Sequence, residues 1–345
     1  MEATAVYCFV MLDVAIGEPT RVVPPQVAAE LHRHRVEGTA FEAAMDAGSN
    51  WMFYGSGYSD ERGRSAPTDV VHTRTGRSDP VDTRVVVNPQ YGLGVVTFWE
   101  RCPDATDPLR VKQRLGEDQT ELRDRLAALG LQWASSGRIF TFLAVQVPTD
   151  DLDALVEAHA GDVGSWFTGN VEDESPEALQ RYARDGNLSG RRFERFYLRW
   201  TDALAVYDST HTDVVPAATR LIRVIEACII MRRLLREVAF EATSITAQVT
   251  PWGLPLLSTG WRRLEHLRRI VAEAELATTV APPIHSVEGQ RLMDEALLRF
   301  DVQATSDHVR QSLAELERRL QWQRIRWIAI AGVLAFVVNL LVTSL

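Results

Sequence analysis

The sequence is poor in lysine and in cysteine. The first shortage bears on the source of the protein, and the second excludes a disulfide-bonded fold. Lys112 is the one lysine among the 37 lysine and arginine residues, and this bias indicates a GC-rich genome and so a bacterial source. The three cysteines, Cys8, Cys102 and Cys228, are odd in number and far apart, so they predict no disulfide framework. We therefore expect the bulk of the chain to lie in a reducing, cytoplasmic compartment.

An excess of positive charge is also missing. The formal net charge is −9 at pH 7, and the isoelectric point is about 5.5. Because nucleic-acid binding depends on a basic field, no binding to a nucleic-acid duplex is expected. The share of hydrophobic residues, 46%, and of charged residues, 24%, is that of an ordered chain.

Motifs that carry chemistry are missing as well. The sequence has no phosphate-binding P-loop, no complete dinucleotide-binding glycine turn, no nucleophile elbow, no His-Glu-x-x-His helix and no Cys-x-x-Cys pair. We therefore expect no enzyme, no catalytic residue, no cofactor and no resident metal.

An uncharged and strongly apolar run is present at the C-terminal end. The nineteen residues 327–345 read WIAIAGVLAFVVNLLVTSL, and as a helix they would extend about 28 Å, close to the thickness of a hydrocarbon core. The apolar run near the N-terminus follows Glu2 and has no basic region, so no signal peptide is expected. The sequence predicts one transmembrane helix, at residues 327–345.

The flanks of this segment predict its orientation. No charged residue follows it, and four arginines precede it: Arg318, Arg319, Arg324 and Arg326. Basic residues remain on the cytoplasmic side of a membrane, and Trp322 and Trp327 stand where an interfacial aromatic belt would lie. We expect a single-pass protein of the bacterial inner membrane with its N-terminal body in the cytoplasm.

Residues 1–208 predict a cytoplasmic domain of the α+β or α/β class, because apolar runs rich in strand formers alternate with helical patterns. The expected strands are Val6–Val14, Arg84–Val87, Leu93–Trp99, Ile139–Val147, Phe193–Trp200 and Ala203–Tyr207. The expected helices are Pro24–Val36, Pro108–Leu129, Asp151–His159 and Pro176–Ala183.

Residues 213–283 predict a long antiparallel helical hairpin. In its first helix apolar residues recur in steps of three and four, the spacing of a helix packed lengthwise against another. They are Leu221, Val224, Cys228, Met231, Leu235, Val238, Ala242, Ile245 and Val249. Pro251-Trp252-Gly253 ends this helix, and Ser258–Ala277 carries the returning one.

Residues 286–326 predict a stalk helix with the same spacing, its seam formed by Val309, Leu313, Leu316 and Leu320. The register continues into the apolar segment as Ile330, Leu334, Val337 and Leu341. A seam that crosses the boundary in one register indicates a single continuous helix over residues 286–345, up to about 90 Å long.

Another face of the apolar segment carries Ala331, Ala335 and Asn339 at intervals of four residues. Small residues at this spacing let helices approach closely, and a membrane asparagine forms interhelical hydrogen bonds. The partners expected are therefore lipid and further copies of the chain in a homo-oligomer. Alanine is also tolerated in a helix that faces lipid, so the alternative is an anchor that does not associate.

The order of these elements resembles the CorA-type divalent-cation transporters, with Tyr197–Asp208 (YLRWTDALAVYD) as the strand pair before the first long helix. That resemblance implies an α/β cytoplasmic domain, long antiparallel helices and a stalk that enters the membrane. The sequence has one membrane segment and no Gly-Met-Asn tripeptide, so the family's selectivity filter corresponds to no residue here. A relative of the divalent-cation transporters remains one alternative.

A second resemblance is to the RMND1-like family of tail-anchored proteins, carried by Tyr91–Glu100 (YGLGVVTFWE). It implies an α/β domain held by one C-terminal membrane helix.

Two charged clusters are candidate ligand sites, each with a structural alternative. Oxygen ligands for a divalent ion are available at Asp150, Asp151, Asp153 and Glu157, although acids also favour the start of a helix. Contacts to a small anionic or nucleotide ligand are available at Arg232, Arg233 and Arg236, which could equally be solubilising charges.

Together these features predict a homo-oligomeric single-pass membrane protein with a cytoplasmic regulatory domain that forms a ligand-gated pore or ion channel. The polar side chains available to line the pore are Asn339, Thr343 and Ser344. In a bacterium such a pore would suit a membrane-disrupting antiviral defence effector. The alternative from another class is a tail-anchored scaffold or assembly factor that does not conduct.

Overall fold

The structure is a computed structural model, and it describes residues 3–15, 52–54, 82–88, 93–102, 123, 126, 132–133, 139–149, 151–168, 175–209, 214–249, 257–279 and 287–344. The chain forms two compact units. The sheet unit comprises Met1–Ile230 and Ala281–Phe300, and the helical unit comprises Met231–Val280 and Asp301–Leu345. Helix α8 (Val214–Gln248) begins in the sheet unit and ends in the helical unit.

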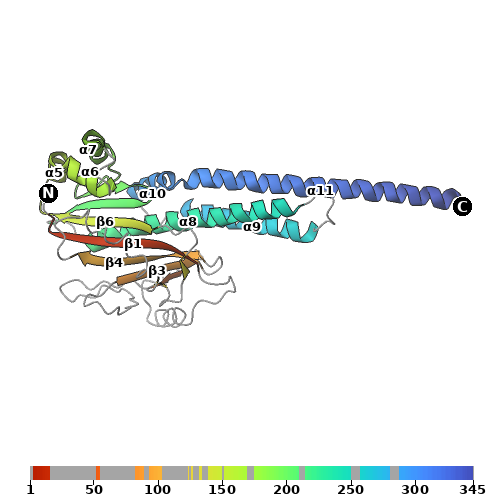
Figure 1. Ribbon diagram of the computed structural model, residues 1–345, viewed down its shortest axis with the longest axis horizontal. Coiled ribbons are helices and arrows are strands. Elements are labelled where there is room, and N and C mark those ends of the chain that lie inside the picture. Colours follow the sequence, from red (N-terminus) through yellow and green to blue (C-terminus); the bar gives the residue numbers. More distant parts are fainter. Residues whose placement is uncertain are drawn as a thin grey trace. The chain divides into compact units, whose positions relative to one another are not determined.

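The sheet unit is built on an eight-stranded mixed sheet with strand order β2-β3-β4-β1-β6-β8-β7, and β5 pairs with β1 (Figure 1). Its strands are β1 (Ala5–Ala15), β2 (Met52–Tyr54), β3 (Asp82–Asn88), β4 (Leu93–Cys102), β5 (Gln132–Trp133), β6 (Ile139–Val147), β7 (Glu194–Leu198) and β8 (Asp202–Asp208). Strands β6 and β8 are parallel, and the other pairs of the described sheet are antiparallel. The mixed α+β class expected from the sequence is therefore what the structure has.

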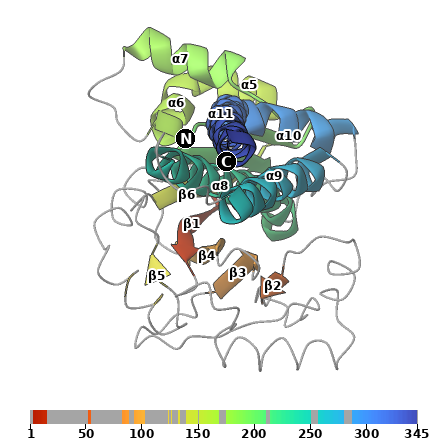
Figure 2. The same cartoon turned by 90° about the vertical axis from the view of Figure 1, so that its right-hand side faces the viewer.

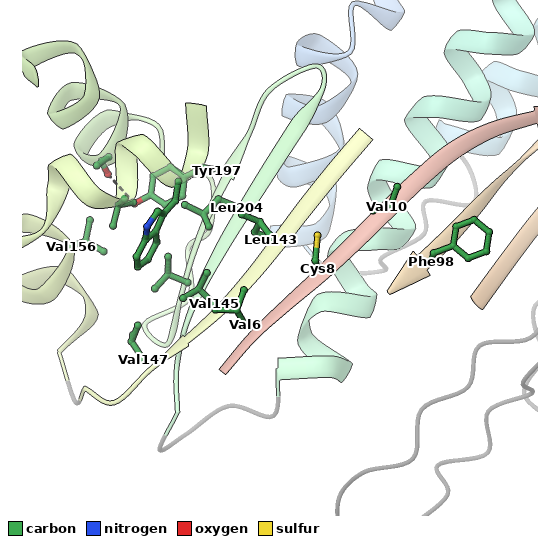
Figure 3. Packing of buried hydrophobic residues seen from close by; sticks show 14 of the residues in the cluster. Val6, Cys8, Val10, Phe98, Leu143, Val145, Val147, Val156, Tyr197 and Leu204 are labelled. Carbon is green, nitrogen blue, oxygen red and sulfur yellow. Dashed lines mark hydrogen bonds between the residues drawn. The ribbon is translucent and has the colours of Figure 1, made fainter. Parts of the chain in front are cut away.

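One face of the sheet packs beneath α5 (Leu152–Ala158), α6 (Ala160–Thr168) and α7 (Pro176–Asp185). The strands supply every second residue to this core, as the period-two geometry of a strand requires. Figure 3 shows Val6, Cys8 and Val10 of β1 in line, with Leu143 and Val145 of β6 beside them. Because both faces of β1 are covered, most residues that point to either face are apolar, and apolar residues do not alternate with polar ones.

The alternate residues point to the opposite face, which the first half of α8 and the end of α10 (Val287–Arg299) cover. Phe9 and Phe142 stack there with ring centroids 5.2 Å apart, and Phe140 stacks on Phe300 at 5.4 Å. The sheet is therefore the middle layer between two sets of helices.

Close packing of α6 on α7 depends on one glycine. A Cβ atom at Gly164 would lie 2.4 Å from the backbone oxygen of Leu179 in α7, whereas a Cβ at Gly161, in the same helix, would meet nothing within 4 Å. Position 164 therefore has to be a glycine, because the backbone of α7 lies against it, whereas position 161 has room for a side chain.

We expect Gly164→Ala to lower the free energy of unfolding by about 1–3 kcal/mol, because the two helices must move apart. The matched control Gly161→Ala is expected to raise it by about 0.5–1 kcal/mol, because alanine loses less backbone entropy in a helix. Chemical denaturation of the full chain measures both, and equal effects of the same sign would contradict the close approach.

The helical unit packs the second half of α8 with α9 (Leu257–Thr279) and α11 (Val302–Ser344), which lie side by side in both Figure 1 and Figure 2. Helix α9 lies directly against α11, and Arg268 of α9 forms an ion pair with Glu317 of α11 at 2.5 Å. The buried side chains of this unit include Leu235, Val238, Ala242, Leu264, Leu267, Leu313 and Leu316.

The prediction of a single continuous helix over residues 286–345 is wrong near its start, whereas the helix is continuous from Val302 to Ser344. The structure has two helices, α10 and α11, separated at Phe300 and Asp301. Asp301 has a backbone φ of 57°, in the left-handed region that aspartate tolerates better than most residues. The break turns Phe300 into the core beside Phe140, and α11 alone, at 43 residues, is about 65 Å long.

Other expectations fare differently. The six expected strands coincide with β1, β3, β4, β6, β7 and β8, and Asp151–His159 and Pro176–Ala183 coincide with α5 and α7. Helix α6 and the short strands β2 and β5 were not expected. The expected helix Pro24–Val36 and almost all of Pro108–Leu129 lie outside the described residues.

Candidate membrane-spanning segment

Helix α11 changes character along its length. By length and composition, it is the one helix in the described part of the chain that is apolar enough to cross a membrane, and none of its most apolar stretch is buried. A core helix of a water-soluble protein passes the same test of composition but is mostly buried. Figure 1 shows α11 continuing past the ends of α8 and α9.

The exposed apolar side chains are large and continuous. Their exposed fractions range from 45% at Val337 to 68% at Val342, and they include Ile325, Ile328, Val333, Leu334, Phe336, Val338, Leu340 and Leu341. Leaving this many apolar side chains in water forfeits on the order of 10 kcal/mol of burial free energy. Continuous surfaces of this kind mark sites for a membrane or a protein partner.

The seam of α11 shows where the cover from the other helices ends. Val309, Leu313, Leu316 and Leu320 are each at most 5% exposed, and Gln323 is 7% exposed. In the same register Trp327 and Ile330 are half-buried, and Leu334 is 60% exposed. One stripe of side chains therefore passes from a packed bundle to a surface that none of the described residues covers.

Two ion pairs within α11 and one hydrogen bond to α8 lie just before that point. Glu315 accepts from Arg319 Nε at 3.0 Å and pairs with Arg318 at 3.0 Å. The hydrogen bond from Arg319, and then the charge of Arg318, lower the pKa of Glu315. Arg319 Nη1 also donates to the Thr246 backbone oxygen at 3.3 Å, which places a cation at the C-terminal end of α8.

The polar residues of the apolar segment differ in what they can do. Thr343 Oγ1 donates to the backbone oxygens of Asn339 at 2.8 Å and Leu340 at 3.1 Å, so the helix itself satisfies this hydroxyl. The Asn339 side chain is exposed, as are Ala331 and Ala335, and the side chain of Ser344 lies outside the described residues. Of the three candidate pore-lining residues, Asn339 is thus the one whose exposed amide the structure shows at the surface of α11.

The three candidate anion-binding arginines of α8 differ in exposure. Arg233 is largely covered and forms an ion pair with Glu237 one turn further along α8. Arg232 is half-buried, and Arg236 is exposed. The charge of Arg233 is already balanced within the helix.

The acidic cluster at the start of α5 has structural roles. Asp151 Oδ1 accepts from the backbone nitrogens of Asp153 and Ala154 at 3.1 Å and so caps the helix. Asp153 pairs with Arg195, and Glu157 pairs with Arg184. Asp150 is not described, and no group of three possible metal ligands occurs among the residues that the structure places.

Sequence reasoning missed two buried polar contacts that fix α8 on the sheet. Arg220 Nη2 donates to both carboxylate oxygens of Glu194 in β7, at 2.6 and 2.7 Å, and Ser189 Oγ donates to Glu194 Oε1 at 2.7 Å. Glu226, 1% exposed, accepts from Thr97 Oγ1 of β4 at 2.7 Å. The available signal was a glutamate inside each apolar run, in FERFYL and in VIEACII.

Two buried titratable groups near these contacts are held neutral. Burial raises the pKa of the Cys228 thiol, so this cysteine behaves as a small hydrophobe rather than as a nucleophile. Burial, and then the negative charge of Glu194, raise the pKa of Tyr207 well above its usual value.

The class defined by these observations is a two-unit chain, with a mixed α+β sheet unit and a helical unit whose last helix is long and apolar enough to cross a membrane. The chain has no match among protein-family models, curated proteins or solved structures.

Proposed function

We propose that the protein is a single-pass membrane protein that assembles with copies of itself through the apolar half of α11. The observation that carries the proposal is the exposed apolar surface from Ile325 to Val342, which no described part of the chain covers. A lipid bilayer supplies the cover for such a surface at the smallest cost in free energy.

Self-association follows from the polar side chain within that surface. The amide of Asn339 loses its bonds to water on entering hydrocarbon, and a matching amide on a neighbouring copy restores them. Ala335 and Ala331, one and two turns earlier, let the two helices approach closely. The expected product is a homo-oligomer with its anchors packed along this stripe.

In the leading form of the proposal the packed anchors surround a ligand-gated pore and the sheet unit regulates it. Helix α8 supports this form because it is one unbroken helix of 35 residues shared by both units. A ligand that moved α8 on the sheet would therefore move the helical unit too. The N-terminal body would then lie in the bacterial cytoplasm, on the side of the arginines.

A tail-anchored scaffold is the second form, and one observation favours it. Because the Thr343 hydroxyl is bonded to its own helix, Asn339 is the main polar group left to line a pore among the candidate side chains that the structure describes. A single amide suits a closed bundle. Planar-bilayer recording with the purified full-length protein separates the two. Current steps that disappear in Asn339→Leu support the pore, and intact oligomers without current support the scaffold.

We expect Asn339→Leu to shift the protein from oligomers toward monomers in detergent, with self-association weakened by about 0.6–2 kcal/mol, or roughly 3–30-fold. Native mass spectrometry of the full chain measures the shift. The matched control Asn339→Leu/Leu340→Asn has the same composition but turns the amide by about 100° around the helix. An oligomer that survives in Asn339→Leu, or is restored in the control, would contradict a specific packing stripe.

A further inference from the structure

A second surface begins where the apolar segment begins, and it combines two helices that are far apart in the sequence. A Cβ atom at Gly260 would lie 2.9 Å from Leu320 Cδ2, so the start of α9 lies against this part of α11. Arg262 and Arg263 stand two and three residues after Gly260 and are exposed. They join the arginines of α11 at the same end of the helical unit.

We call this set the arginine collar, and its members are Arg262, Arg263, Arg318, Arg319, Arg324 and Arg326. The described residues contain no acidic side chain from Arg318 to the end of α11, and none from the start of α9 to Leu264. The nearest acidic residues are Glu317 on α11, Glu265 on α9 and Glu241 on α8, and each lies on the side away from the apolar segment. After Glu317 on α11 and before Glu265 on α9, the charged residues that the structure describes are therefore all arginines, although the whole chain carries −9.

The members of the collar differ in their contacts within the helical unit. Arg318 and Arg319 share Glu315, and Arg319 also donates to the Thr246 carbonyl. Arg262, Arg263 and Arg324 are exposed and stand outside that network of contacts with Glu315. Trp322 is 68% exposed and lies about one turn from Arg318 and Arg326, and indole rings favour the interface between water and lipid.

We propose that the arginine collar binds the headgroups of anionic phospholipids and so seats the end of the helical unit on the membrane surface. Headgroup phosphates lie directly outside the hydrocarbon core, which is where the collar stands if the apolar half of α11 spans that core. Guanidinium groups bind phosphate oxygens through paired hydrogen bonds. The inference rests on the proposed membrane insertion and adds a lipid preference and a role for α9.

The test measures which lipid the full-length protein retains. Protein purified in mild detergent is supplied with equal amounts of phosphatidylglycerol and phosphatidylcholine, and native mass spectrometry counts the bound lipids. We expect the wild-type chain to prefer phosphatidylglycerol and Arg262→Gln/Arg263→Gln to lose that preference by about fivefold for each arginine removed. Arg324→Gln, on the other helix, is expected to cause a loss of the same kind.

The matched control is Arg236→Gln/Arg269→Gln, which removes the same charge from exposed positions outside the collar and is expected to keep the preference. An equal loss in this control, or displacement of the lipid by excess inorganic phosphate, would overturn the inference, because either result indicates general attraction of anions. Circular dichroism confirms that each variant is folded.

The two proposals fail in distinguishable ways. If alkaline carbonate releases the wild-type chain from membranes, the proposed membrane function fails. If the chain resists carbonate but retains both lipids equally, the anchor stands and the collar's lipid preference is wrong.

Discussion

Replacement of Arg220 by methionine is expected to lower the free energy of unfolding of the sheet unit by about 3–5 kcal/mol. Only 3% of the Glu194 side chain and 13% of the Arg220 side chain are exposed. Without the guanidinium, Glu194 keeps one described donor, Ser189 Oγ, and its charge stays buried against Tyr207. Urea unfolding of the full chain in mild detergent, followed by tryptophan fluorescence, measures the loss.

The control for this substitution is the double variant Glu194→Gln/Arg220→Met, in which no charge is buried. We expect it to recover more than half of the loss, because the penalty comes from the unpaired carboxylate rather than from the missing attraction. If the double variant is as unstable as Arg220→Met alone, the packing of the arginine stem, and not its charge, sets the stability.

The double variant Leu334→Arg/Val338→Arg is expected to move the protein from the membrane to the soluble or aggregated fraction. On the biological insertion scale each arginine near the centre of a membrane helix costs about 3 kcal/mol, so the pair opposes insertion by about 6 kcal/mol. Both positions lie in the apolar half of α11, where the side chains are 60% and 58% exposed. Carbonate extraction of cell membranes followed by immunoblotting is the measurement.

The control is Leu298→Arg/Phe240→Arg. These two positions lie outside the apolar segment, and their side chains are 63% and 74% exposed, about as much as those of Leu334 and Val338. We expect the control to stay in the membrane fraction, because arginine at a water-facing position opposes nothing. If both variants leave the membrane equally, destabilised folding explains the loss and the assignment of α11 as the anchor is wrong.

Much of the architecture could be predicted from local patterns. Each predicted strand carries enough apolar and β-branched residues to indicate burial by itself, as Ile139–Val147 does for β6. The seam of α8 was visible because a helix buried along one side repeats apolar residues in steps of three and four, and Leu221, Leu235 and Ala242 are all fully buried.

The missed elements owe their form to distant neighbours. Helix α6 was not expected because Gly161, Gly164 and Ser165 resemble a loop, yet Gly164 is small because the backbone of α7 lies against it. The break between α10 and α11 has no proline or glycine to mark it. It is set by Phe300, whose ring finds its stacking partner Phe140 some 160 residues earlier in the chain.

The candidate site divides in the same way. Arg318, Arg319, Arg324 and Arg326 were recognised from their position before the apolar segment, whereas Arg262 and Arg263 were not. Only the contact between Gly260 and Leu320 brings α9 to the same level. The acidic cluster at Asp151 and Asp153 likewise lost its appearance of a metal site once the structure showed the helix cap and the pairing with Arg195.

The sequence by itself determined the apolar segment and its basic flank, because the cost of placing residues in water or in hydrocarbon is a sum over single side chains that needs no knowledge of neighbours. The tertiary structure decided which part of the α11 seam is covered, where the helix breaks, and that Glu194 meets Arg220. Those properties depend on atoms brought together from distant parts of the chain, and no local pattern of residues records them.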